Sequence, residues 1–168
     1  GSKFAIIGPS GSGKSTIMKL LSGIIYKDKG YLYINGDDMN INPLKIKSKI
    51  GYMPQKNDLN KDLTIIQNIS LFGELFGISK RDSIKRAKIL CKKLNLEKFI
   101  YKKPIELSLS INRMTMFARS ILHNPEIILL DEPSLNLDIR YKDLLWSFLT
   151  EHIENRTIIY STNNTSEV

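Results

Sequence analysis

A nine-residue stretch near the start of the chain, GPSGSGKST at Gly8 to Thr16, constrains the fold more than any other feature. It matches the pattern G-x-x-x-x-G-K-[ST], in which glycines let backbone N–H groups curl around phosphate oxygens without a Cβ in the way. The apolar run Phe4 to Ile7 before it suits a buried strand, and a helical pattern of apolar residues follows it. The order strand, glycine-rich loop and helix predicts a phosphate-binding loop in an α/β domain.

Each part of this loop has an expected role. The helix after the loop points its N-terminus at the phosphates and adds about half a positive charge. Lys14 is expected to reach the β and γ phosphates, and the Ser15 hydroxyl is expected to coordinate Mg²⁺. A flexible glycine turn is the alternative interpretation, and the flanking strand and helix argue against it. The residues expected to bind nucleotide are Gly8, Pro9, Ser10, Gly11, Ser12, Gly13, Lys14, Ser15 and Thr16.

A second apolar run, Ile127 to Leu130, ends in the two acids Asp131 and Glu132. A short, wholly apolar run is typical of a buried parallel strand. Ligands of an open α/β sheet lie beyond the carboxyl ends of its strands, so both acids are expected to face the phosphates. We expect Asp131 to hold Mg²⁺, through water, and Glu132 to orient or deprotonate the attacking water. A solvated strand end is the bland alternative for such an acidic pair.

Composition narrows the class of protein. A chain of 168 residues with 42% hydrophobic residues suits one compact domain with a sub-domain. The net charge of +8 comes from scattered lysines interleaved with acids, which favours a solvated basic surface, and no nucleic-acid partner is expected. The apolar runs are far shorter than the roughly 20 residues of a membrane span, so we expect a soluble, cytosolic-type domain. The single cysteine, Cys91, lies in a helical apolar pattern and is interpreted as buried and unreactive.

The P-loop is shared by several classes of nucleotide-hydrolysing protein. A GTPase reads guanine with N-K-x-D, and the nearest candidate here, NKDL, has Leu63 where the aspartate must stand. Taken together, the motifs resemble those of the nucleotide-binding domain of ABC (ATP-binding cassette) proteins, in the family's order. They are the P-loop, GYMPQ ending at Gln55, a signature region at Leu107 and Ser108, ARSILHNPEIILLDEP, and NLD at Asn136 to Asp138.

The resemblance implies a P-loop NTPase of the α/β class, with a mainly parallel sheet flanked by helices and an inserted helical sub-domain. Residues 1–56 and 120–168 are then the ATPase core, and residues 57–119 the helical sub-domain that carries the signature region. Gly30 to Gly36 alternates into an Asn-Gly turn and reads as a strand-rich region. Capping boxes are predicted at Thr64 with Gln67 and, similarly, at Ser79.

The resemblance also implies ligands, roles and partners. ATP and Mg²⁺ are the expected ligands, Lys14, Gln55 and Glu132 the expected catalytic residues, and Ser15, Gln55 and Asp131 the expected metal ligands. The expected partners are a second nucleotide-binding domain and a transmembrane permease, at the cytoplasmic face of a membrane. The C-terminal segments RYKDLLWSFL and STNNTSEV are similar to those of ATPases that serve drug, antibiotic and polysaccharide exporters.

Two departures from the family pattern affect hydrolysis. The signature LSGGQ of the family acts in trans on a partner's nucleotide, and this chain has Leu109, Ser110 and Ile111 in place of the glycines and glutamine. Side chains at the glycine positions are expected to crowd the phosphate. The second departure is Asn163, which stands where the family usually has a switch histidine. Losing such a donor typically lowers the rate about 10²-fold to 10³-fold.

Neither His123 nor His152 is placed in the sequence to substitute for the switch histidine. We therefore expect Mg-ATP binding with slow hydrolysis, in an asymmetric pair whose partner supplies an intact signature. A non-hydrolytic ABC module with a structural or regulatory role is the alternative. An ABC protein of translation or DNA repair also fits the positive charge but has no nucleic-acid signature here.

Overall fold

The structure is a computed structural model and describes residues 1–151 and 155–167. These residues form two compact units, which we call the sheet unit and the helical unit. The sheet unit contains Gly1–Gln55, Asn124–Pro133 and the segment that starts at Asn155, and the helical unit contains Lys56–His123 and the segment that starts at Ser134. The division by contacts therefore differs from the sequence-based one, because the helix after Ser134 groups with the helical unit.

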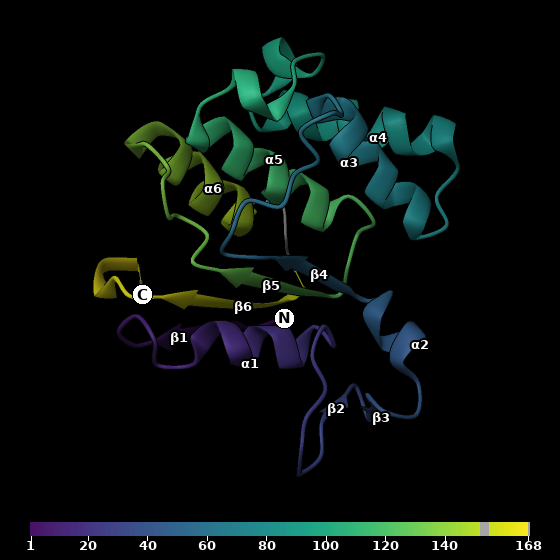
Figure 1. The fold of residues 1–168 in the computed structure, drawn as a ribbon, viewed down its shortest axis with the longest axis vertical. Helices are drawn as coiled ribbons and strands as arrows, with labels where there is room; N and C mark the ends of the chain where they lie inside the picture. Colours follow the sequence, from purple (N-terminus) through teal and green to yellow (C-terminus); the bar gives the residue numbers. More distant parts are fainter. Residues whose placement is uncertain (152–154, 168) are drawn as a thin grey trace. The chain divides into compact units, whose positions relative to one another are not determined.

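The sheet unit is built on four parallel strands. They are β1 (Lys3–Ile7), β4 (Ile50–Met53), β5 (Ile127–Asp131) and β6 (Thr157–Thr162), in the spatial order β1-β6-β5-β4 (Figure 1). The register pairs Ile7 with Thr162, Asp131 with Ser161 and Met53 with Leu130. Because all four strands run the same way, their carboxyl ends meet at one edge of the sheet. The predicted parallel sheet is confirmed.

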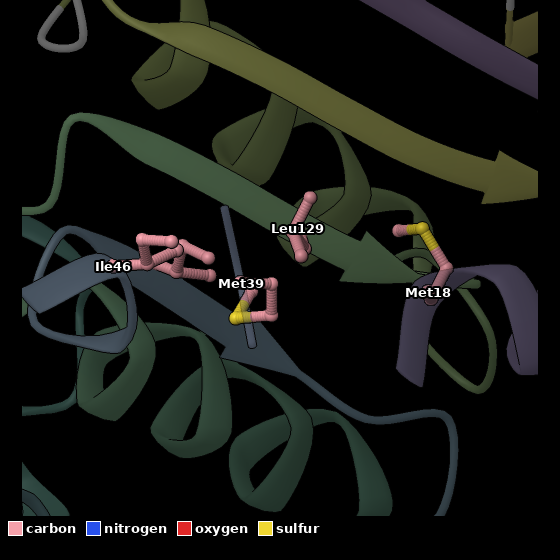
Figure 2. Close-up of a cluster of buried hydrophobic side chains, with 5 residues drawn as sticks. Met18, Met39, Ile46 and Leu129 are labelled. Atoms are coloured by element: carbon pink, nitrogen blue, oxygen red, sulfur yellow. The ribbon is translucent and has the colours of Figure 1, made fainter. Parts of the chain in front are cut away.

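Two helices of the sheet unit flank the strands. Helix α1 (Lys14–Leu21) contacts β5 and β6, and the short helix α2 (Pro43–Lys47) contacts β4. A hydrophobic cluster joins these elements, and Figure 2 draws its five side chains, four of them labelled. Burial of such side chains contributes roughly 1.5–3 kcal/mol each and holds α1 on the sheet. The cluster consists of Met18, Met39, Ile46, Ile50 and Leu129.

The segment Gly30 to Gly36 and its continuation form a small antiparallel pair. Strands β2 (Tyr33–Ile34) and β3 (Asp37–Asp38) are joined by a two-residue turn at Asn35 and Gly36. Both turn residues have positive φ, 52° and 81°, which is the conformation that a type I′ hairpin turn requires. The predicted Asn-Gly turn is confirmed.

The helical unit contains four longer helices: α3 (Ile65–Leu75), α4 (Lys80–Lys93), α5 (Leu109–Ile121) and α6 (Ile139–Glu151). Two 3₁₀ turns, η1 (Glu97–Phe99) and η2 (Pro104–Glu106), connect α4 to α5, and a third, η3 (Thr165–Glu167), lies in the sheet unit. Helices α3, α4 and α5 contact one another, and Phe117 of α5 meets Phe148 of α6 edge to face at 5.7 Å.

Local hydrogen bonds explain where these helices begin. Thr64 and Gln67 form the predicted capping box at the start of α3. At the start of α4 the Ser79 hydroxyl accepts from the Asp82 N–H. At the start of α6 a carboxylate oxygen of Asp138 accepts from the Tyr141 N–H at 3.0 Å. Each cap satisfies a backbone donor that the helix itself leaves unpaired.

The single cysteine and the lengths of the helices bear on two predictions made from the sequence. Cys91 is fully buried in α4, and this burial raises the pKa of its thiol to about 12. The thiol is therefore almost entirely protonated at neutral pH, and the predicted burial of Cys91 is confirmed. Across residues 1–151 and 155–167, no helix has the length and apolar character needed to span a membrane.

Candidate functional site at the carboxyl edge of the sheet

The residues predicted to handle phosphate and metal lie in segments that follow the carboxyl ends of the strands. The loop Gly8 to Gly13 follows β1, Asn163 follows β6, Glu132 follows β5, and Gln55 comes two residues after β4. A hydrogen bond of 3.3 Å from the Gly8 N–H to the Thr162 carbonyl joins the first two of these segments. The sheet topology thus gathers at one edge residues that are far apart in the sequence.

Glycines shape the phosphate-binding loop. Gly11 and Gly13 have φ of 83° and 90°, a conformation that L side chains rarely adopt, and a Cβ at either position would meet no atom within 4 Å. Gly13 is also the N-cap of α1, and no side chain caps this end of the helix. Open space in front of a helix N-terminus that lacks a side-chain cap is the arrangement that binds an anion. The loop therefore fits the predicted phosphate group.

Lys14 is held at the centre of the loop. Only 7% of the residue is exposed, and its Nζ donates to the carbonyls of Gly8, at 2.7 Å, and Pro9, at 3.1 Å. The same nitrogen lies 3.3 Å from Oε1 of Glu132. A buried ammonium needs such partners, because an uncompensated charge in this position would cost several kcal/mol. The residues predicted for phosphate binding and for water activation thus contact each other directly.

Asp131 and Glu132 are both buried, at 1% and 7% exposure. The hydroxyl of Ser161, the strand partner of Asp131, donates to Asp131 Oδ1 at 2.6 Å. It also accepts from the Glu132 N–H at 2.9 Å. Glu132 Oε2 accepts from the Asn163 N–H at 3.3 Å. The two acids are therefore fixed by hydrogen bonds to β6 and the residue after it, which excludes a solvated strand end.

Glu132 has an unusual backbone. Its φ of 50° lies in the left-handed region, and the other non-glycine residues with positive φ in the described chain are all asparagines. Asparagine tolerates this region well, whereas a longer side chain there costs of order 1–3 kcal/mol. The backbone conformation at this position does not favour glutamate. What glutamate contributes here is its carboxylate, which contacts the Lys14 ammonium and the Asn163 N–H.

The switch position contributes its backbone to this group of contacts. Asn163 is exposed, and its N–H rather than its side chain contacts Glu132. His123 stacks on Phe76 in the helical unit, with ring centroids 3.8 Å apart, and His152 lies outside the described residues. Gln55 is exposed and lies two residues after β4, which is the edge strand next to β5.

The donors at this edge also fit magnesium. Mg²⁺ keeps several waters and uses one or two protein oxygens with those of a phosphate, so a dedicated cage of side chains is not required. Within the described part of the chain, no three His, Cys, Asp or Glu side chains gather as a metal cluster. One hydroxyl and one carboxylate are predicted as ligands, Ser15 on the first turn of α1 and Asp131 at the end of β5. This is the small number of protein oxygens that Mg²⁺ needs.

The signature region lies in the helical unit, at the start of α5. Ser108 is exposed and caps α5, accepting from the Ile111 N–H at 3.4 Å, while Leu107 lies just before it. Leu109 is 61% exposed and Ser110 only 7% exposed. The Ser110 hydroxyl donates to the Asn136 carbonyl at 3.2 Å and accepts from the Asp138 N–H at 3.1 Å.

These contacts change one expectation. Of the two side chains at the signature glycine positions, that of Ser110 points into its own helical unit and is satisfied there. Only Leu109 presents an apolar side chain to solvent, so any crowding of a partner's phosphate falls to that residue.

Two serines have structural roles at these motifs that the sequence does not reveal. The sequence predicts no role for Ser161, and it predicts only that the Ser110 side chain crowds a partner's phosphate. The signal for Ser161 is a hydroxyl at the end of a buried strand, but it becomes informative only once the register opposite Asp131 is known. For Ser110 the chain must first bring Asn136 and Asp138 next to α5.

Comparison with known proteins identifies the family. The sequence model of the family described as "ABC transporter" matches residues 1–135. An uncharacterised ABC transporter ATP-binding protein of Methanocaldococcus jannaschii is 34% identical over the whole chain and 60% of its own length. A molybdate/tungstate import ATP-binding protein of Pyrococcus abyssi is 35% identical over 88% of this chain and 42% of its own length.

An exporter protein and a solved structure extend the comparison. The Nod factor export ATP-binding protein I of Burkholderia lata is 30% identical over 97% of this chain and 54% of its own length. A dimeric ATP-binding cassette, solved in a post-hydrolysis state bound to ADP and Pi, matches with a TM-score of 0.87 and 30% identity. That match covers 97% of this chain and 75% of the solved one. The chain spans about 42% to 60% of the length of the sequence relatives named here.

Proposed function

Because the chain belongs to the ABC transporter family, we propose that it is the nucleotide-binding part of a transport ATPase. It holds Mg-ATP at the carboxyl edge of its sheet. The observation that carries this proposal is the meeting of Lys14, Asp131, Glu132 and the backbone of Asn163 at that edge. Burying three charged side chains together is costly, and the arrangement is favourable when a charged ligand completes it.

Binding uses the loop and α1. The backbone N–H groups of Gly8 to Thr16 and the N-terminus of α1 receive the phosphates, and the Lys14 ammonium turns from the Gly8 and Pro9 carbonyls toward them. Ser15, Gln55 and Asp131 are the proposed metal ligands, Asp131 through water. These residues would hold Mg²⁺, which would supply positive charge to the phosphate oxygens.

Hydrolysis uses Glu132. Its carboxylate is fixed from two sides, by the Lys14 ammonium and the Asn163 N–H, so its position does not depend on a histidine at the switch position. When Lys14 engages phosphate, Glu132 keeps the contact with Asn163 and can orient or deprotonate a water. Asn163 lacks the imidazole that would contact the γ-phosphate, and for this reason we propose slow turnover.

The transporter context is also a proposal. Two domains of this kind clamp ATP head to tail, with the signature of each facing the nucleotide of the other. With Leu109 exposed at its own signature, this chain works best opposite a partner whose signature is intact. A membrane permease completes the transporter, with this chain at the cytoplasmic face of the membrane. The relatives named above include an importer and an exporter, and we favour export from the C-terminal segments.

The test of this proposal compares two lysines of the same helix. Lys14→Ala removes the buried ammonium, and Lys19→Ala removes an exposed one in the last turn of α1. In the complete polypeptide with its partner, calorimetry is expected to detect Mg-ATP binding in the native protein and in Lys19→Ala. Binding is expected to weaken at least about 100-fold in Lys14→Ala, a loss of about 2.7 kcal/mol. Equal binding by both variants would contradict the proposal.

A second candidate function follows from the same departures. With Leu109 exposed and asparagine at position 163, the chain fits a module that binds ATP to stabilise an assembly and does not hydrolyse it. Replacing Glu132 separates the two functions, because only a hydrolysing chain loses turnover when its general base is removed.

A further inference from the structure

We propose that Ser161 is a positioning residue for both acids of the site, fixing Asp131 for the metal and Glu132 for the water. This inference rests on the proposed Mg-ATP function and adds a residue to it. Ser161 is the last but one residue of β6 and is fully buried, with 0% exposure. A hydroxyl in such a place must have partners, and the partners of Ser161 are the two acidic residues.

The direction of each hydrogen bond is fixed by chemistry. The Glu132 N–H can only donate, so the Ser161 oxygen accepts from it at 2.9 Å. The hydroxyl proton is then available for the Asp131 carboxylate, which can only accept, at 2.6 Å from Oδ1. The short distance is that of a charge-assisted bond. One hydroxyl therefore connects the backbone of Glu132 to the side chain of Asp131.

The hydrogen bonds with Ser161 restrain the backbone of Glu132, which is in a strained conformation. Glu132 sits in the left-handed region with φ of 50°. Its N–H lies 2.9 Å from the Ser161 hydroxyl and 3.2 Å from the Ser161 carbonyl, so both oxygens of one residue hold the turn in place. With this turn formed, the Glu132 carboxylate reaches the Lys14 ammonium and the Asn163 N–H. Strained conformations of this kind persist only when the surroundings enforce them.

The hydrogen bond from Ser161 fixes the rotation of the Asp131 carboxylate. A carboxylate at a strand end can turn about its side-chain bonds, and the bond from Ser161 selects one orientation. Partners that orient a metal ligand typically change metal affinity or activity about 10-fold to 100-fold when they are removed. We therefore expect loss of the Ser161 hydroxyl to weaken the use of metal more than the binding of nucleotide alone.

Ser161→Ala tests this role, with Ser83→Ala as a matched control. Ser83 is also a serine with 0% exposure, and its hydroxyl donates to the Ser70 carbonyl at 2.5 Å within the helical unit. Both variants lose a buried hydroxyl bond, but only Ser161→Ala loses one to the acids. Circular dichroism and thermal unfolding establish that each complete protein is folded before binding is measured. Ser161→Thr keeps the hydroxyl and serves as the rescue variant.

The readouts separate metal use from nucleotide binding. Mn²⁺ binding in the presence of ADP, followed by electron paramagnetic resonance, is expected to weaken about 10-fold or more in Ser161→Ala. ADP binding in EDTA is expected to stay within about twofold of the native value, as are both measurements in Ser83→Ala. Activity is expected to need a correspondingly higher Mg²⁺ concentration in Ser161→Ala, and Ser161→Thr is expected to restore both the Mn²⁺ affinity and this requirement.

The inference is overturned if folded Ser161→Ala binds Mn²⁺ as the native protein does. It is equally overturned if ADP binding in EDTA falls as much as Mn²⁺ binding, since that pattern indicates general damage to the site. Failure of the proposed function looks different. In that case the native protein itself takes up no ADP, with or without metal, and the variants do not differ from it.

Discussion

The carboxyl edge of the sheet unit and the start of α5 in the helical unit differ in the kind of polar side chain that they bury and in what those side chains contact. At the edge, Lys14, Asp131 and Glu132 are buried and directed at one another or at shared partners, and one of them occupies a strained backbone conformation. At α5, the Ser110 hydroxyl turns into its own unit, and Leu109 is left in solvent.

The difference distinguishes side chains that are kept although they lower stability from side chains that simply pack well where they are. Buried charges and a left-handed glutamate lower stability, and their presence supports the proposal that these side chains serve binding or reaction. At α5 nothing is strained in this sense, because Ser108 caps the helix and Ser110 forms two ordinary hydrogen bonds. The departures in the signature region therefore lie where the chain accommodates them by normal packing, whereas the edge proposed to bind ATP keeps its buried charged residues. The departure at that edge, Asn163, still donates its N–H to Glu132.

The largest expected effect tests whether the edge is catalytic. Glu132→Gln keeps the size of the side chain but removes its basicity, and phosphate release by the complete protein with its partner is expected to fall at least about 10²-fold. Mg-ATP binding, measured by calorimetry on the same variant, is expected to persist. An unchanged rate of phosphate release would assign hydrolysis elsewhere and favour the non-hydrolytic module.

A gain of function addresses the switch position. Asn163→His restores the family's imidazole at the switch position, and turnover is expected to rise about 10-fold or more, because a positioned donor contributes about 10²-fold to 10³-fold in comparable sites. Asn164→His is the matched control: this neighbour accepts from the Ser166 N–H in the adjacent turn and is expected to give no gain. If both histidine variants turn over at the native rate, slow hydrolysis has another cause.

Restoring the family glycine at position 110 tests how much the Ser110 hydroxyl contributes to the stability of the region around α5. Ser110→Gly removes the hydroxyl that joins α5 to Asn136 and Asp138, and leaves two backbone groups without this partner. The free energy of unfolding, from urea denaturation, is expected to fall by about 1–3 kcal/mol. Leu109→Gly, at an exposed position in the first turn, is expected to lose no more than about 1 kcal/mol. Equal losses would contradict the inward role of Ser110.

The smallest effect concerns the thiol of Cys91. Burial raises the pKa of this thiol to about 12, so the reactive thiolate is nearly absent below that pH. In the native protein at pH 8, alkylation of Cys91 by iodoacetamide, followed by mass spectrometry, is expected to be negligible. Denaturation in urea exposes the thiol and is expected to make it react at the ordinary rate. Rapid alkylation of the folded protein would disprove its burial.

Much of the fold could be predicted from local patterns. The strand, loop and helix around Gly8 to Thr16, the strand that ends in Asp131, and the caps at Thr64 and Asp138 each have a signal within a few residues. These features depend on backbone propensity and hydrophobic spacing, which a single sequence contains.

The rest depends on register and on contacts between distant segments. Ser161 opposes Asp131 only because β5 and β6 pair in one particular register, and a shift by one residue would turn the hydroxyl to the other face. The left-handed conformation of Glu132 is set by its partners and has no signal in the residue itself. The inward turn of Ser110 required α5 and the segment Asn136 to Asp138 to be neighbours.

The central claim is that the edge around Lys14 and Asp131 takes up nucleotide together with metal. The most direct measurement is calorimetric titration of ATP into the complete polypeptide, with Mg²⁺ and with EDTA, for the native protein and for Asp131→Asn. The account predicts tighter binding with Mg²⁺ in the native protein, and loss of that metal-dependent gain in Asp131→Asn with little change in EDTA. No uptake of ATP by the native protein, or an undiminished metal effect in Asp131→Asn, would contradict it.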